Sequence, residues 1–135
     1  MPAAFVNQVA EAATWRRYDA NEYLIRERQL ADGLHLILKG KVALELASAS
    51  RGGIQVQTAG AGEVAGWSWL IPPYSSYLDV RALEPTETVK IDATCLRGLL
   101  KKKPATGFEF LMRLLPVLAQ RLEYTMIQLT NLYGI

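Results

Sequence analysis

The feature that most constrains the fold is a series of short β-like runs between residues 14 and 92. The runs read WRRY, EYLIRER, HLILKG, VALELAS, IQVQTA, YLDVRAL and TVKI. Turn-forming residues separate them, at Asp19-Ala20-Asn21, Ala31-Asp32-Gly33, Lys39-Gly40, Arg51-Gly52-Gly53 and Gly60-Ala61-Gly62. Evenly spaced short strands with such turns are typical of antiparallel sandwiches and barrels. The sequence therefore predicts a mainly β protein, with an antiparallel β-roll over residues 14–92.

Alternation within the runs predicts which residues face solvent. In VALELAS, Ala43 and Glu45 alternate with larger apolar residues, and in IQVQ the residues Gln55 and Gln57 do the same. Because successive side chains of a strand point to opposite faces, we expect these four residues on solvent-facing surfaces. His35 lies in the run HLILKG, where we expect a surface or half-buried strand residue rather than a catalytic one.

Helical periodicity flanks the β region on both sides. Residues 3–13 predict a short amphipathic helix, and residues 93–103 predict another that begins at the N-cap residue Asp92 and is stopped by Pro104. A long C-terminal helix is predicted over residues 105–133.

The C-terminal segment carries a heptad seam, because apolar residues recur at alternating steps of three and four. Its members are Phe108, Leu111, Leu115, Leu118, Leu122, Thr125, Leu129 and Leu132. We expect one side of the helix to pack on the β-roll and the other to form a homodimer; packing on its own domain alone is the alternative. Pro116 predicts a kink or a new helix start near Leu115.

Composition limits the class of protein. The chain has 135 residues, of which 50% are hydrophobic and 21% charged, which suits one domain over residues 1–135. One cysteine and one histidine exclude an intrachain disulfide and the usual Cys/His zinc sites, and favour a reducing cytoplasm. A formal charge of +2 does not indicate nucleic acid as a partner. With neither a secretion signal nor an apolar run of membrane-spanning length, we expect a cytoplasmic protein with no membrane partner.

No pattern of catalytic residues stands out. Acidic residues are scattered, and neither a GxxxxGK[ST] loop nor a GxGxxG after a strand is present. An acidic pair assembled in space stays possible. We predict no enzyme activity, no catalytic residue, no metal and no resident cofactor.

The candidate functional segment is 60–82, GAGEVAGWSWLIPPYSSYLDVRA, where glycines, prolines and aromatic residues gather between β runs. A helical turn within 62–66 would present backbone N–H groups as a small anion cradle, and Ser75 and Ser76 would add hydroxyl donors. A long loop pinned by aromatic packing is an equal alternative. The aromatic residues of the segment, which either fill a cavity or form a different pocket, are Trp67, Trp69, Tyr74 and Tyr77.

Four pieces of sequence, in this order, resemble the cyclic-nucleotide-binding domain of the catabolite-activator and fumarate–nitrate-reductase regulator superfamily. They are Ala31-Asp32 followed by HLILKGKV, then GAGEVAG at 60–66, Val80-Arg81-Ala82, and Leu118-Ala119-Gln120-Arg121-Leu122. The resemblance implies an eight-stranded antiparallel β-roll, or jelly roll, with a long C-terminal helix that commonly forms a dimer interface.

The resemblance also implies roles for single residues. Glu63 stands where the family's glutamate accepts hydrogen bonds from the ribose hydroxyl, and Thr125 stands where the long helix often offers a hydroxyl to the base. Ser76 stands where the family has an arginine that pairs with the cyclic phosphate, so the phosphate counter-charge is missing and a cyclic nucleotide is a doubtful ligand. Arg81 is expected to point away from the core by strand alternation. The candidate ligand-binding residues are Gly62, Glu63, Val64, Ala65, Gly66, Ser75, Ser76, Tyr77 and Thr125.

Three functional hypotheses follow. The first is a non-catalytic regulatory domain that is dimeric through residues 108–133. Its cassette, the segment 60–82, is degenerate because it lacks the phosphate arginine, and it binds an unidentified small-molecule effector or a protein partner. The second is a genuine cAMP or cGMP sensor that uses Glu63. The third is an interaction module that docks through aromatic residues between 69 and 77. Because the sequence ends at Ile135, without a helix-turn-helix, we expect no DNA binding by this chain, which resembles the stand-alone members or the sensor half of a longer regulator.

Overall fold

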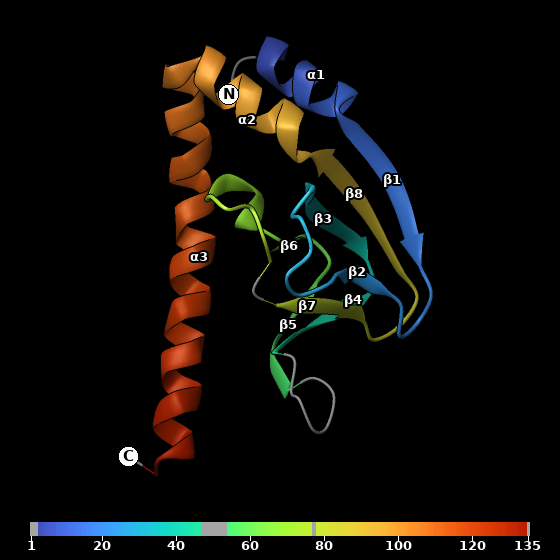
Figure 1. Cartoon of the computed structure of the whole chain (residues 1–135), viewed down its shortest axis with the longest axis vertical. Helices are drawn as coiled ribbons and strands as arrows, with labels where there is room; N and C mark the ends of the chain where they lie inside the picture. Colours follow the sequence, from blue (N-terminus) through green and yellow to red (C-terminus); the bar gives the residue numbers. More distant parts are fainter. Residues whose placement is uncertain (1–2, 47–53, 77, 135) are drawn as a thin grey trace.

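The computed structural model describes residues 3–46, 54–76 and 78–134, and it shows two four-stranded antiparallel sheets with helices at one end and along one side (Figure 1). In chain order the elements are α1 (Ala3–Glu11), β1 (Ala13–Tyr18), β2 (Tyr23–Ile25), β3 (Gly33–Lys39), β4 (Lys41–Leu46), β5 (Ile54–Gly60), β6 (Val64–Ala65), the 3-10 helix η1 (Ser68–Leu70), β7 (Asp79–Ala82), β8 (Thr86–Asp92), α2 (Ala93–Lys102) and α3 (Pro104–Leu132). The predicted turn Arg51-Gly52-Gly53 lies outside the described residues.

The two sheets enclose the core of the predicted roll. One has the strand order β1-β8-β3-β6 and the other β2-β7-β4-β5, and each neighbouring pair is antiparallel. Buried apolar side chains from both sheets fill the interior, namely Ile37, Val42, Leu44, Ala59, Ala65 and Val80. Gly40, at the turn between β3 and β4, has a φ of +100°, a conformation that favours glycine. The eight-stranded β-roll is confirmed.

A second buried cluster joins the roll to the helices. Leu34, from β3, points away from the roll interior and packs with Trp69, Ala93 and Leu96. The cluster holds α2 against the end of the roll, where Asp92 caps the helix by accepting a hydrogen bond from the Cys95 amide at 2.9 Å. This cap confirms the predicted start of the helix.

The long helix α3 begins at Pro104 and runs down the side of the roll (Figure 1). It starts against α2, since a Cβ on Gly107 would stand 2.6 Å from the Leu100 carbonyl oxygen. The helix continues through Pro116 to Leu132, so no new helix starts near Leu115.

Two predictions about strand residues are wrong. Ala43 and Glu45 are buried rather than wet, because β4 is a central strand and the Glu45 carboxylate accepts two hydrogen bonds, each 3.0 Å, from the Arg81 guanidinium on β7. His35 is also fully buried, because it shares the inward face of β3 with Ile37.

Candidate functional site

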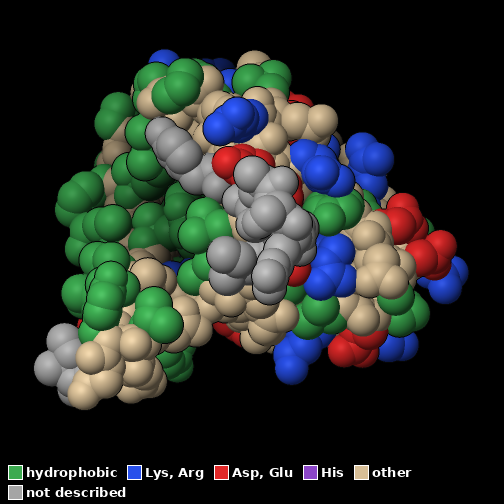
Figure 2. Space-filling model, turned by 60° about the horizontal axis from the view of Figure 1, so that its bottom comes forward, with side chains coloured by type: hydrophobic (Ala, Val, Ile, Leu, Met, Phe, Trp, Pro, Cys, Tyr) green, Lys and Arg blue, Asp and Glu red, His purple; other side chains and the backbone are tan. Residues whose placement is uncertain are grey.

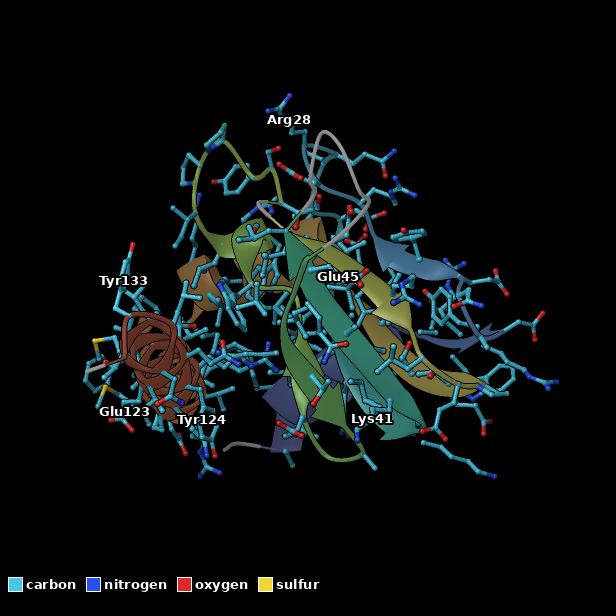
Figure 3. All side chains as sticks on the ribbon, turned by 90° about the horizontal axis from the view of Figure 1, so that it is seen from below. Arg28, Lys41, Glu45, Glu123, Tyr124 and Tyr133 are labelled. Carbon is cyan, nitrogen blue, oxygen red and sulfur yellow. The ribbon has the colours of Figure 1, made fainter. Side chains whose placement is uncertain are left out.

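A cleft of about 690 Å³ lies between the roll and α3. Its lining comprises Gln57, Thr58 and Glu63 from the roll and Val117, Gln120, Arg121, Tyr124, Ile127 and Gln128 from α3. Figure 3 looks along α3 and shows the helix beside the roll, with Tyr124 among its side chains. The cleft is a place where a bound molecule would touch both the rigid roll and the helix.

A smaller cavity of about 290 Å³ adjoins this cleft, and the two share Gln57 and Arg121. Most of its lining is apolar, namely Leu44, Val56, Trp67, Ile71, Leu78, Leu118 and Leu122, with Gln57, Arg121 and Thr125 as the polar members. The site thus combines a polar cleft with an apolar chamber beside it.

Arg121 lies at the boundary between the two cavities. Its side chain reaches from α3 into the roll, where Nη2 donates a hydrogen bond to the Val64 carbonyl and the guanidinium carbon lies 4.7 Å from the centroid of the Trp67 ring. The residue is only 8% exposed, so burial lowers the pKa of the guanidinium, while the charge of Glu63 opposes this shift. The Arg121 guanidinium is therefore a buried cation that has few polar partners.

Gln57 links β5 to α3 by hydrogen bonds beside this cation. Its Nε2 donates to the Arg121 carbonyl at 2.6 Å and to the Thr125 hydroxyl at 3.0 Å, and that hydroxyl donates in turn to the Arg121 carbonyl at 2.9 Å. Thr125 thus lines the apolar chamber, but its hydroxyl already has protein partners.

Of the predicted ligand residues at 62–66, Glu63 lines the cleft. Its Oε1 accepts a hydrogen bond from the Gly60 amide at 3.0 Å. The predicted helical turn is wrong, because Val64 and Ala65 form strand β6 against β3. The amides of Gly62 and Glu63 donate to Ile37 and Gly60 carbonyls, so these two N–H groups are not free to cradle an anion.

Neither Ser75 nor Ser76 is among the residues that line the two cavities. Ser75 forms a β-bridge with Leu30, and the Ser76 hydroxyl donates to the Leu78 carbonyl at 2.7 Å. Tyr77, the remaining predicted ligand residue of this segment, lies outside the described residues. The structure therefore does not bring the two serines together with Glu63 and Thr125 at the cleft.

Arg81 points away from the cleft, as strand alternation predicts. Its guanidinium pairs with Glu45 at 3.0 Å and donates to Asn21 at 2.8 Å. In Figure 3, Glu45 lies on β4, apart from the helix. Arg81 consequently supplies no counter-charge at the position of the missing phosphate arginine.

The aromatic residues of the segment have different environments. Trp69 is fully buried in the cluster under α2, where its indole N–H donates to the Gly66 carbonyl at 3.1 Å. Tyr74 is half-buried with the Arg97 guanidinium 4.2 Å from its ring centroid, whereas Trp67 lines the apolar chamber. Burial of Trp69 removes it from the surface that the interaction-module hypothesis requires.

The heptad seam of α3 is mostly exposed. Leu111 and Leu118 are half-buried, whereas the exposed members are Phe108, Leu115, Leu122, Thr125, Leu129 and Leu132. The side of the helix that is buried on the rest of the chain follows a different row, Gly107, Leu114 and Arg121. Figure 2 shows the exposed hydrophobic side chains gathered along the helix.

Sequence reasoning missed Gln57 and Arg121 as site residues. The sequence predicts that Gln57 faces solvent. Arg121 is named there only as one residue of the 118–122 piece that resembles the family, with no role of its own. One signal was available: Gly107, Leu114 and Arg121 are spaced by seven residues, which places a charged residue in the row that contacts the roll.

Within residues 3–46, 54–76 and 78–134, no three His, Cys, Asp or Glu side chains group as metal ligands would. No helix in these ranges has the length and apolar content needed to cross a bilayer.

The chain is an eight-stranded β-roll with a long helix along one side and a cleft between the two. The family model of the cyclic nucleotide-binding domain matches residues 15–103, and the chain belongs to that family. Among curated proteins, none matches the chain in sequence.

Solved structures show the same fold at low sequence identity. A protein of Geobacter metallireducens described as cyclic nucleotide-binding has a TM-score of 0.81 and 24% identity, over 90% of this chain and 88% of that one. The c-di-GMP responsive global regulator CLP of Xanthomonas campestris has a TM-score of 0.81 and 19% identity, over 98% of this chain and 65% of that one. The catabolite activator protein of Thermus thermophilus has a TM-score of 0.73 and 21% identity, over 98% and 61%. The resemblance to the catabolite-activator type is confirmed at the level of the fold.

Proposed function

We propose that the chain is a non-catalytic regulatory domain of the cyclic nucleotide-binding type. Its cassette, residues 60–82, is degenerate because it lacks the phosphate arginine, so the cleft binds a small-molecule effector that is not held through a cyclic phosphate. The observation that carries the proposal is the cleft between β5 and α3, which retains Glu63 but not the serines at the phosphate position. An effector there would act on the roll and the helix together, and we place this activity in the cytoplasm.

The fold is compatible with other effectors. The Xanthomonas regulator that shares it is named as responsive to c-di-GMP, which supports a proposal in which the effector of this chain is not a cyclic mononucleotide. In this chain the hydroxyl of Ser76 donates its hydrogen bond to the Leu78 carbonyl. It is therefore unsuited to replace an arginine that pairs with a phosphate.

The first test is titration of the purified protein with cAMP and cGMP. We expect neither heat nor a thermal shift at millimolar nucleotide, because the cyclic phosphate would lack its counter-charge. A thermal shift would report binding, since a ligand that binds the folded state must raise its apparent stability. Micromolar affinity would overturn the proposal in its present form. A metabolite panel screened by thermal shift provides the positive arm, and the small-molecule proposal fails if no compound stabilises the protein.

The second candidate function is a genuine cyclic-nucleotide sensor. It is favoured by one observation, that Glu63 and Arg121 both line the cleft. If the sensor is real, Glu63→Ala should abolish nucleotide binding, because the ribose hydroxyl would lose its carboxylate acceptor. Retained binding in that variant would remove the ribose role.

We further propose a homodimer through α3, because large apolar side chains remain exposed along the helix. Light scattering at high micromolar concentration should give about twice the chain mass of 15.0 kDa. Leu122→Asp combined with Leu129→Asp should give the monomer mass, whereas Arg113→Ala, an exposed polar change on the same helix, should not. A monomeric wild-type chain would refute the dimer.

A further inference from the structure

The starting observation is an unpaired buried cation. Arg121 is 8% exposed, and within the described part of the chain its Nη1 has no hydrogen-bond partner and no carboxylate forms an ion pair with it. The hydrogen bond from Nη2 to the Val64 carbonyl and the nearby Trp67 ring are the only described polar contacts of the guanidinium. Buried charges in proteins are ordinarily paired, so this guanidinium has an unused capacity to bind an anion.

The second observation is the apolar chamber that Arg121 and Trp67 line together. The chamber has about 290 Å³, near the lower end of the roughly 300–1,000 Å³ typical of ligand pockets. Trp67, Leu44, Leu78 and Leu118 are among its apolar lining residues. Such a chamber accepts one compact ring or a short branched chain, because burial of apolar surface is favourable there.

The position of Glu63 selects between the two cavities. Its carboxylate lines the wider cleft but not the apolar chamber. A second negative charge beside Glu63 would be repelled, which disfavours an anion on that side of Arg121. An anionic group is therefore favoured on the Trp67 side of Arg121, next to the chamber.

We propose that the effector is an amphiphilic anion: a carboxylate or phosphate head that pairs with Arg121, joined directly to a compact aromatic or aliphatic body that occupies the chamber against Trp67. This inference rests on the proposed function and specifies its ligand class. It requires neither a ribose nor a cyclic phosphate, and both head groups suit the bidentate geometry of a guanidinium.

The test uses matched probes on the full chain, read by ligand-observed NMR and calorimetry. Phenylacetate and phenyl phosphate carry the two possible heads, phenylacetamide carries the same body without charge, and acetate carries the head without the body. We expect at least one of the first two to bind, and both phenylacetamide and acetate to bind at least about tenfold more weakly. The stronger of the two charged aromatic probes identifies the head group.

Variants test the role of Arg121 itself. Arg121→Met should weaken binding of the acid at least about tenfold while leaving the weak binding of phenylacetamide unchanged. Its fold should survive, because replacing an unpaired buried charge by an apolar side chain of similar length is often neutral or stabilising. Arg113→Met, an exposed arginine on the same helix, should bind the acid as the wild type does.

The outcomes separate this inference from the proposed function. Equal binding of phenylacetate and phenylacetamide, or unchanged acid binding in Arg121→Met, overturns the amphiphilic-anion class. If neutral metabolites stabilise the protein and none of the acids does, the inference fails and the proposed function stands. If no compound of either kind stabilises it, both fail.

Discussion

Replacing Trp69 by alanine should lower the free energy of unfolding by about 3–5 kcal/mol, the usual cost of removing a large buried aromatic side chain. Trp69 is 0% exposed, and its ring contacts Phe110 of α3 edge to face with centroids 6.5 Å apart. Its backbone carbonyl also accepts a 2.6 Å hydrogen bond from Arg97 of α2. The side chain itself packs with Ala93 and Leu96 of α2. It therefore joins the roll to both helices, and its loss leaves a cavity where three elements meet.

The measurement is urea denaturation followed by far-UV circular dichroism, which does not depend on tryptophan fluorescence. Trp15→Ala is the matched control, because Trp15 is 57% exposed on β1. Surface substitutions of this kind usually change stability by less than about 0.5 kcal/mol. Similar losses in the two variants would show that Trp69 does not hold the helices to the roll.

Local patterns were sufficient to predict most of the fold. Strand alternation and turn glycines predicted the roll, and Asp92 followed by an apolar period predicted α2, because each signal acts within a few residues of the chain. The burial of Glu45 was not predictable in this way. It depends on Arg81, which lies 36 residues away and reaches Glu45 only when β4 and β7 pair.

The candidate site was predicted less well, for the same physical reason. Glu63 was identified through the resemblance of residues 60–66 to the family, but the hydrogen bond from Gln57 to the Arg121 carbonyl joins residues 64 positions apart. In the sequence, Gln57 is a polar residue alternating along a strand, and only the placement of α3 over β5 makes it a site residue. Arg121 likewise became a site residue through the helix face on which it lies.

The second large effect is a loss of stability in acid that originates at His35. Burial lowers the pKa of His35 from an ordinary value of 6.5 to about 4, and the positive charge of Lys90 adds to this effect. The charge of Arg16 also lowers the pKa, whereas the charge of Asp32 raises it. The residue is 1% exposed, neither ring nitrogen has a hydrogen-bond partner in the described part of the chain, and the Tyr18 ring centroid lies 6.3 Å away. The folded state therefore keeps the imidazole neutral.

The sign of the pH effect follows from proton binding. Between pH 6.5 and 4 the unfolded chain binds a proton at His35 that the folded chain does not, so stability falls as the pH is lowered through this window. The contribution is fully present above pH 6.5, and about 3 kcal/mol of it is lost by pH 4. Carboxylates also titrate in acid, so the relevant quantity is the difference between the wild type and His35→Leu, which should change by about that amount between pH 7 and pH 4.

His35 is the only histidine in the chain, so its imidazole proton resonance needs no assignment by mutation. An NMR titration of the folded protein should show no shift of that resonance until the pH falls well below 6.5, or should show unfolding first. A midpoint near 6.5 with the fold intact would mean that the imidazole reaches water. In that case the acid sensitivity of the protein would have to arise from its carboxylates, and His35→Leu would leave the slope of stability against pH unchanged.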